Sequence, residues 1–404
     1  MPTYTYKARD AAGKSVKGTM ETENKTELID RLHKMGYMTT SASEVASGRQ
    51  FGLLFDKLKW IAASDMLMFY IQLSNMINAG ITILTSLSIL ANQIENRGLK
   101  EAVGSVARQV EGGSLLSRAF RLHPRIFSKL FVSMIEVGEE SGKLDTVLSR
   151  YADFFEQQEE LKQKIKGALF YPLILFLAGA AVSLFIVTFI IPQFAQIYLK
   201  AGIKLPLPTL IVFKVGLAIK RYWYLLVIFV IAIILGLRYY FKTEKGGFLF
   251  DTLKLRAPII GSLYRKAVIS RFSRTLSTLL GSGVPILKSL DITKEVLGNL
   301  VLARVITNVR KSVENGEHIA EPLKISGEFP PDVAQMISVG EETGGLVEML
   351  YKIANFYDLA VSYAVKKLTT VIEPLFLVIM GSMVGLIMAS MLMPMFDLVK
   401  TLRR

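Results

Sequence analysis

Two nearly identical acidic motifs come closer to a chemical site than any other pattern in this chain. Met134–Leu144 reads MIEVGEESGKL, and Met336–Leu346 reads MISVGEETGGL. The first superficially resembles a loop that binds phosphate through glycines and a lysine. Such a loop has four residues between its glycines and Ser or Thr after the lysine, whereas three residues separate Gly138 from Gly142 and leucine follows the lysine. The second motif has no lysine, so we expect no nucleotide site here.

The glycines of the two motifs predict a turn between helices instead. Glycine adopts backbone conformations that other residues avoid, and both motifs supply it at the same places: Gly138, Gly142, Gly340 and Gly344. Each motif also carries a pair of carboxylates: Glu139 and Glu140, Glu341 and Glu342. These pairs either cap and pack helices or contact a basic partner or a cation, and the sequence leaves both alternatives open.

The remaining patterns predict neither catalysis nor a cofactor. The histidines His33, His123 and His318 are isolated, no HExxH, GxSxG or GxGxxG motif occurs, and the chain has no cysteine. A zinc site would then need carboxylates that cluster with histidine, and none do. Calcium held by the glutamate pairs is the one metal alternative. We therefore expect a protein that is not an enzyme and that holds no cofactor.

The acidic motifs belong to a longer internal repeat. LSNMINAGITIL at Leu73–Leu84 matches LSTLLGSGVPIL at Leu276–Leu287, and the two copies extend over about Phe69–Tyr198 and Phe272–Val399. This period is far longer than that of a solenoid. Glycines and prolines divide a helical pattern in each copy, so each copy is predicted to be a compact helical bundle followed by a membrane segment.

The composition indicates membrane-spanning segments combined with sizeable parts in water. The 404 residues are 51% hydrophobic and 20% charged, and the mean hydropathy is +0.40. Such a chain is too apolar for an ordinary soluble protein and too charged for one that lies entirely in lipid. The net charge of +14 fits a cytoplasmic face that meets anionic lipid better than it fits nucleic acid, which we do not expect as a partner.

Three apolar stretches are long enough to cross a bilayer, which takes about 20 residues as a helix. They are residues 168–191, 222–241 and 371–396. Positive charge gathers on one side of them, because residues 1–167 hold 22 Lys and Arg and residues 242–367 hold 17, whereas residues 192–219 hold three. Cytoplasmic segments are rich in these residues, so the N-terminus and both bundles are predicted to lie in the cytoplasm.

These observations predict nine parts in chain order. They are an N-terminal α/β unit at 1–45, a linker at 46–58, a cytoplasmic bundle at 59–167, a span at 168–191, a periplasmic loop at 192–221, a span at 222–241, a second cytoplasmic bundle at 242–370, a span at 371–396 and a periplasmic tail at 397–404. In the N-terminal unit we expect three strands and one helix: Thr3–Ala8, Ser15–Met20, Tyr37–Ser43 and the helix Lys25–Met35. Leu28, Leu32 and Met35 lie on one face of that helix.

The first and third spans share small residues and prolines. Small residues recur at a spacing of four: Gly179, Ser183, Gly381, Gly385 and Ala389. Because small residues let helices approach closely in lipid, we expect them to form a packing seam. Prolines mark the span edges at equivalent places in the two copies: Pro172, Pro192, Pro374 and Pro394.

The chain resembles the type II secretion F family in its two helical domains. Each domain carries the motif VGEE-S/T-G-x-L, and each runs through x-Pro into a span that ends in Pro. The resemblance covers essentially the whole chain, and the second copy departs from the first only by Gly345 in place of Lys143. The expected fold is an all-α membrane protein with two repeated cytoplasmic helical bundles, three transmembrane helices and a small N-terminal α/β unit.

The resemblance implies a non-enzymatic platform in the bacterial cytoplasmic (inner) membrane. Its implied partners are a cytoplasmic hexameric assembly or retraction ATPase, pilins or pseudopilins, other inner-membrane assembly proteins, a second copy of the chain and the lipid bilayer. We favour a platform that couples the ATPase to pilin insertion into, or extraction from, a type IV pilus. The alternative is a type II secretion F protein that drives a pseudopilus. A small-molecule transporter is a remote alternative, because three spans with no buried charge pair make a poor solute path and transporters usually show broken helices at mid-membrane.

Overall fold

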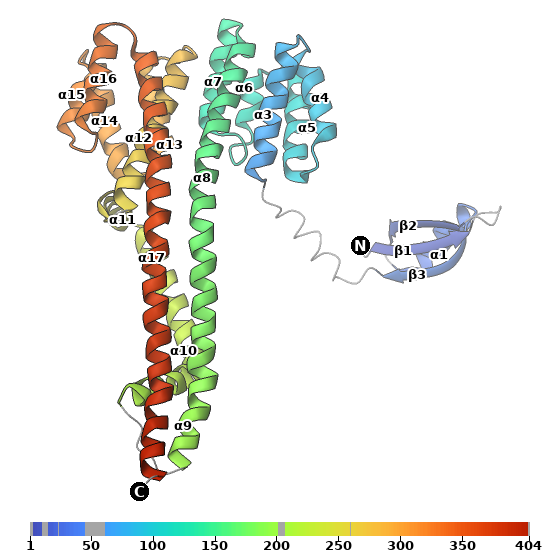
Figure 1. The fold of residues 1–404 in the computed structure, drawn as a ribbon. Helices are drawn as coiled ribbons and strands as arrows, with labels where there is room; N and C mark the ends of the chain where they lie inside the picture. The colour runs from blue at the N-terminus through green and yellow to red at the C-terminus, as the bar shows by residue number, and fades with distance from the viewer. Residues whose placement is uncertain are drawn as a thin grey trace. The chain divides into compact units, whose positions relative to one another are not determined.

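The computed structural model describes residues 3–9, 15–22, 24–44, 61–200, 207–258 and 260–402 (Figure 1). Residues 10–14, which connect the first two predicted strands, and the predicted linker at 46–58 lie outside the described residues. The chain falls into two compact units, Met1–Leu115 and Leu116–Arg404. The boundary between them lies within the stretch that the sequence predicts as the first bundle.

The N-terminal residues form a three-stranded antiparallel sheet with one helix, which confirms the predicted α/β unit. The elements are β1 (Thr3–Arg9), β2 (Ser15–Glu21), α1 (Lys25–Lys34) and β3 (Met38–Glu44), in the strand order β2-β1-β3. Leu28 and Leu32 of α1 are fully buried, and Tyr6 and Tyr37 pack against them. Met35, expected on the same face, is 59% exposed, because α1 ends before it and Met35 is the C-cap.

Six helices make up the first copy of the repeat. They are α3 (Ala63–Asn78), α4 (Ile83–Gln93), α5 (Arg97–Glu111), α6 (Leu116–Arg121), α7 (Lys129–Ser141) and α8 (Leu144–Phe185). Side chains cap the N-termini of three of them. Thr82 accepts a hydrogen bond from an amide of α4, Asn96 from two amides of α5 and Ser128 from an amide of α7. Such N-caps satisfy amides that have no partner inside the helix.

Six helices in the same order make up the second copy. They are α12 (Ile260–Gly281), α13 (Ile286–Leu297), α14 (Leu300–Glu314), α15 (Ala320–Ile325), α16 (Pro331–Glu342) and α17 (Leu346–Leu402). Their apolar faces form one buried core, in which several side chains have no exposed surface: Phe272, Leu276, Leu290, Leu297, Ile306, Leu323, Val333, Ile337, Leu350 and Ile353. The duplication predicted from the sequence is therefore present as a duplicated helix order.

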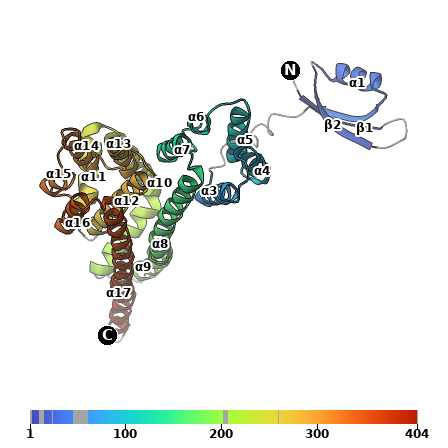
Figure 2. The same cartoon turned by 90° about the horizontal axis from the view of Figure 1, so that it is seen from above.

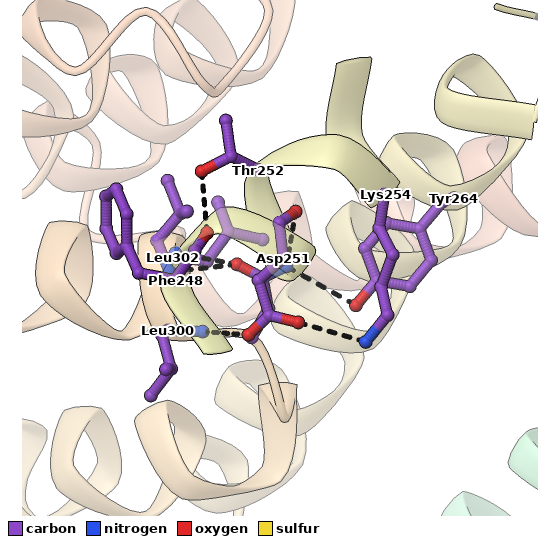
Figure 3. Close-up of polar contacts among 9 residues, drawn as sticks. Phe248, Asp251, Thr252, Lys254, Tyr264, Leu300 and Leu302 are labelled. Atoms are coloured by element: carbon purple, nitrogen blue, oxygen red, sulfur yellow. Dashed lines mark hydrogen bonds and ion pairs between the residues drawn. The ribbon is translucent and has the colours of Figure 1, made fainter. Parts of the chain in front are cut away.

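One further helix, α11 (Glu244–Arg256), precedes the second copy. Its Asp251 is buried and accepts a hydrogen bond from the backbone amide of Leu300 at 2.8 Å, while Lys254 pairs with the same carboxylate at 2.9 Å (Figure 3). Asn299 donates to the Asp251 carbonyl oxygen at 3.3 Å and accepts from the amide of Leu302 at 3.1 Å. These contacts fix α11 to the start of α14.

The last helix of each copy continues from its bundle into an apolar segment. Helix α8 runs through Pro172 and continues as a π-helical turn, η1 (Ile186–Ile190), and then as α9 (Ile191–Lys200). Helix α17 runs unbroken over 57 residues. The two lie side by side (Figure 1, Figure 2). Both are long and apolar enough to cross a membrane.

A third apolar helix, α10 (Leu207–Phe241), is bent. Its two halves, Leu210–Leu225 and Val227–Phe241, meet at 54° and make a third crossing if they are counted as one span. Tyr222 has a non-helical backbone just before the bend, with φ −116° and ψ 16°.

The stretch 192–221, predicted as a periplasmic loop, is mostly helical in its described part. It holds most of α9 and the first half of α10, and residues 201–206 between them lie outside the described residues. Val212 from this stretch is buried together with Ile191, the residue just before the stretch, and Ile387 of α17. The small number of charges in this stretch predicts a loop outside the cytoplasm, whereas its apolar residues pack as helices. Its prolines do not prevent this, because a proline near the start of a helix does not interrupt the helix.

The Asp251–Asn299 junction gives a test with a control in the other copy. Asn96→Ala removes only a cap and should lower the free energy of unfolding by about 1 kcal/mol. Asn299→Ala removes the equivalent cap of α14 and also the bond to α11, so it should cost about 1 kcal/mol more.

The measurement is thermal unfolding of the detergent-solubilised protein, combined with hydrogen exchange of α11. We expect faster exchange of the α11 amides in Asn299→Ala and not in Asn96→Ala. Equal losses of stability with unchanged exchange of α11 would show that Asn299 does not hold this helix.

Candidate functional site

Each acidic motif forms the turn between the fifth and sixth helix of its copy. Gly142 follows α7 with φ 67°, and Gly344 follows α16 with φ 72°. These are left-handed conformations, which cost a residue with a Cβ roughly 1–2 kcal/mol. Gly345 has no such conformation, which is why Lys143 can stand at its place in the first copy.

Gly138 and Gly340 lie inside α7 and α16 rather than in the turns. A Cβ on Gly138 would come within 3.0 Å of Leu144 Cδ2, and a Cβ on Gly340 within 3.0 Å of Leu346 Cα. The helix after each turn therefore folds back tightly onto the helix before it. The four glycines thus divide into two that allow the turn and two that allow the close helix crossing.

The first glutamate of each pair binds the start of a short helix within its own copy. Glu139 accepts hydrogen bonds from the amides of Leu116 at 2.5 Å and Ser117 at 3.0 Å. Glu341 accepts them from Ile319 at 2.7 Å and Ala320 at 3.1 Å. Both carboxylate oxygens are used each time, so these residues follow the capping interpretation. A carboxylate at a helix N-terminus also interacts favourably with the helix dipole.

The second glutamate of each pair is exposed. Ser338 donates a hydrogen bond to Glu342 at 3.0 Å. In the described part of the chain, no group forms a hydrogen bond or ion pair with Glu140. The interpretation as a partner contact therefore stays a prediction for Glu140 and Glu342 alone.

Two ion pairs join the first copy to the second. Lys129 of α7 lies 2.6 Å from Glu295 of α13, and Glu136 of α7 lies 2.8 Å from Lys288 of α13. The partners are seven residues apart on both helices and their charges are exchanged, so only an antiparallel alignment of α7 and α13 satisfies both. Exposed pairs contribute little stability, but this pattern selects one register.

Glu136 also lies 3.1 Å from Arg121 of α6. The hydrogen bond from Lys288, followed by that from Arg121, lowers the pKa of Glu136 below its ordinary value of 4.5, against the opposing effect of burial. The sequence analysis did not predict these ion pairs. A sequence pattern alone does not show which helix of one copy contacts which helix of the other.

The membrane seam stays a prediction, and the small residues of the two spans have different surroundings within this chain. A Cβ on Gly179 of α8 would come within 2.8 Å of Met380 Sδ, and Ser183 is buried. Gly381 and Gly385 of α17 have no described atom within 4 Å of such a position, and Ala389 is half-buried. Gly216 of α10, which the sequence analysis did not select, makes the closest crossing, since its Cβ would come within 2.2 Å of the Val187 carbonyl oxygen.

The span-edge prolines lie within helices. Pro172 is inside α8, Pro192 is the second residue of α9, and Pro374 and Pro394 are inside α17. None of the four ends its helix. Within the residues that the structure describes, no three His, Asp or Glu side chains come together as a possible metal site.

A duplicated six-helix domain, whose last helix continues into an apolar segment, defines a class of repeat-built membrane proteins. The family described as type II secretion system (T2SS), protein F, matches residues 69–192 and 272–394, and the N-terminal domain of type II secretion system protein F matches residues 1–43. The chain belongs to this family.

Curated relatives cover almost the full chain. The type IV pilus assembly protein PilC of Thermus thermophilus is 39% identical over 100% of this chain and 99% of its own length. PilC of Myxococcus xanthus is 33% identical over 98% of this chain and 94% of its own length. The type II secretion system protein F of Xanthomonas campestris is 34% identical over 98% of this chain and 99% of its own length.

The bidentate role of Glu139 gives a prediction with a neighbour as its control. Glutamine has one acceptor oxygen, and its amide group would face a backbone amide, so Glu139→Gln should lower the free energy of unfolding by about 1–2 kcal/mol. Glu140→Gln should leave it unchanged, since Glu140 is exposed. Thermal unfolding in detergent measures both, and Glu341→Gln with Glu342→Gln repeats the comparison in the second copy. Equal stability of all four variants would contradict the capping role.

The lowered pKa of Glu136 predicts a pH dependence of stability. A group with a depressed folded pKa stabilises the folded state above its unfolded pKa, and this contribution is lost as the pH falls through the folded pKa. The difference in melting temperature between the natural protein and Glu136→Gln should therefore be constant from about pH 7 to about pH 5 and vanish in more acidic buffer. It should also shrink in molar salt. A difference that stays the same at every acidic pH at which the protein remains folded would exclude the ion pairs as its cause.

Proposed function

We propose that this protein is the inner-membrane platform of a machine that assembles type IV pili. In this proposal it couples a cytoplasmic ATPase to the insertion of pilins into the filament or to their extraction from it. The names of the relatives with 39% and 33% identity support the pilus. A type II secretion system is the second candidate, which the relative with 34% identity over nearly the full chain supports.

The observation that carries the proposal is the continuity of α8 and α17. Each begins at the motif turn of its bundle and extends without interruption into the apolar region. A platform has to transmit motion from a water-exposed domain to subunits in the bilayer. A continuous helix does so without a flexible joint, and the tight crossings at Gly138 and Gly340 hold it to the bundle.

The proposed topology places both bundles and the N-terminus in the cytoplasm. It rests on the distribution of Lys and Arg, with α10 as the returning crossing. The bend in α10 then lies within the bilayer or close to its surface. On this topology the motif turns lie at the cytoplasmic side, where an ATPase reaches them.

The exposed glutamates Glu140 and Glu342 are proposed as contacts for a basic surface of that ATPase or of another cytoplasmic partner. Complementary charges favour association and orientation. Because Glu139 and Glu341 cap the short helices, Glu140 and Glu342 can contact a partner without any change to the fold. Glu140 has the stronger claim, since Glu342 already accepts a hydrogen bond from Ser338.

The test is filament assembly in cells that carry Glu140→Gln, Glu342→Gln or both. We expect association with the partner to weaken by about two- to fivefold for Glu140→Gln, with a smaller effect for Glu342→Gln and fewer filaments in proportion. Membrane levels of each variant are compared by blotting.

Glu317→Gln serves as the control, because Glu317 is another exposed carboxylate outside the motifs. Normal filaments from the double variant at a normal protein level would place the partner surface elsewhere. Loss of filaments in Glu317→Gln as well would assign the effect to total charge.

A further inference from the structure

One side of α11 exposes large apolar side chains. Leu249 is 47% exposed, Phe250 37% and Leu253 54%. Residues four apart lie one above the other on a helix, so Leu249 and Leu253 share one face and Phe250 lies at its edge. An exposed apolar patch on a helix is typical of a surface that contacts another protein or a membrane.

The opposite side of α11 is fixed to the second bundle. Asp251 and Leu255 are buried there, and Asp251 accepts the hydrogen bond from the amide of Leu300 in α14 (Figure 3). The guanidinium of Arg304, also in α14, lies 4.7 Å from the centre of the Phe248 ring. The bundle thus holds one side of the helix and leaves the side with the apolar patch exposed.

The start of α11 is fixed to the end of α10. The Thr243 hydroxyl accepts a hydrogen bond from the amide of Gly246 at 3.1 Å and donates one to the Tyr240 carbonyl oxygen at 2.7 Å. A Cβ on Gly246 would come within 2.1 Å of the same carbonyl oxygen, so this approach requires glycine. The ring of Phe241, the last residue of α10, stacks on Phe250 with 4.3 Å between the ring centres. The apolar surface of α10 therefore continues onto the patch.

The end of α10 has the features of a span that reaches the surface of a bilayer. Val227–Phe241 is its second apolar half, and Tyr239 and Tyr240 near its end are 78% and 49% exposed. Tyrosine is enriched where a span meets the headgroups. Only two residues separate α10 from α11, which lies at the end of the second bundle that faces the apolar helices (Figure 1).

Positive charges surround the patch. Lys242, Lys245 and Arg256 are exposed and form no ion pair with any described residue, and Glu244 is the one exposed acid between residues 242 and 256. Lys245 lies four residues before Leu249 and Arg256 seven residues after it, so both lie beside it on the helix surface. Basic residues next to a span attract the anionic lipids of the cytoplasmic leaflet, and their long side chains can lie along apolar surface while the charge stays in water.

We propose that α11 binds the cytoplasmic surface of the bilayer, with anionic phospholipids as its ligands. Leu249, Phe250 and Leu253 enter the boundary between headgroups and acyl chains, and Lys245 and Arg256 contact lipid phosphates. Because the other side of α11 is fixed to α14, this contact holds the second bundle against the membrane. The inference rests on the proposed topology, in which the second bundle is cytoplasmic, and not on the choice between pilus and secretion system.

The natural chain has no cysteine, so one introduced cysteine carries a fluorescent probe at a single place. Leu249→Cys and Leu253→Cys place bimane on the patch of the full chain, which is reconstituted in nanodiscs of phosphatidylcholine with rising fractions of phosphatidylglycerol. Acrylamide quenches probes in water, and nitroxide-labelled lipids quench probes in the bilayer. We expect both probes to be quenched by the labelled lipids and, at high phosphatidylglycerol, to be quenched several times less by acrylamide than a probe in water.

Two further positions calibrate the measurement. Ile325→Cys, at the end of α15, replaces a side chain that is 76% exposed, and its probe should be quenched by acrylamide alone. Phe229→Cys, in the second half of α10, replaces one that is 65% exposed, and its probe should be quenched by the labelled lipids alone. The Phe229 probe separates the topology from the inference, because it reports whether α10 lies in the bilayer whatever α11 does.

The charge requirement is tested in the Leu253→Cys background. Changing both Lys245→Gln and Arg256→Gln should lower the docking constant of α11 on phosphatidylglycerol by about tenfold or more, since each cation near an anionic surface contributes roughly fivefold. Lys324→Gln, at an exposed lysine of α15, is the control and should dock as the natural protein does.

The proposal is overturned if acrylamide quenches the Leu249 and Leu253 probes as strongly as the Ile325 probe while the Phe229 probe lies in lipid. Protection of both patch probes from both quenchers also overturns it, because a protein surface such as a second copy of the chain then covers the patch. A Phe229 probe in water overturns the proposed topology and this inference with it. Equal docking of the double Gln variant and Lys324→Gln overturns the role of anionic lipid.

Discussion

The rest of the structure depends on the close crossing of two helices at a glycine in each copy. At Gly138 and at Gly340 the absence of a Cβ lets the next helix return within van der Waals distance, and a left-handed glycine four residues later makes that return possible. The glutamate between them fixes a third helix through two backbone amides. In each copy the eleven residues of the acidic motif thereby set the direction of the helix that follows, α8 or α17. The apolar segment of that helix continues in the same direction.

The two copies keep this scaffold and differ in what is attached to it. The second copy is preceded by α11, which Asp251 and Asn299 fix to the bundle. It also buries Arg274 where the first copy has Ile71. The exchanged charges on α7 and α13 then align these two helices with each other.

Much of the fold follows from local patterns. The repeat, the strands and helix of the N-terminal unit and the two turn glycines are properties of short segments, and the sequence predicts them. The helices within 192–221 were missed, because their prolines and low charge are also typical of a loop and only the contact with Ile387 distinguishes the two. The use of both Glu139 oxygens, the close approach at Gly216 and the contacts of the buried Arg274 with Asn355 and Asp358 depend on residues distant in sequence. The periodicity of the sequence does not predict these contacts.

The length of α8 makes it a lever as well as a connection. Its 42 residues correspond to about 63 Å at 1.5 Å per residue. A tilt of about 10° at the bundle end would move the far end sideways by about 11 Å, roughly the diameter of one helix. A small change in the angle of α8 at its bundle end would thus become a displacement of the size of a single membrane helix. The pivot of that movement would be the crossing at Gly138, which a single added methyl group would obstruct.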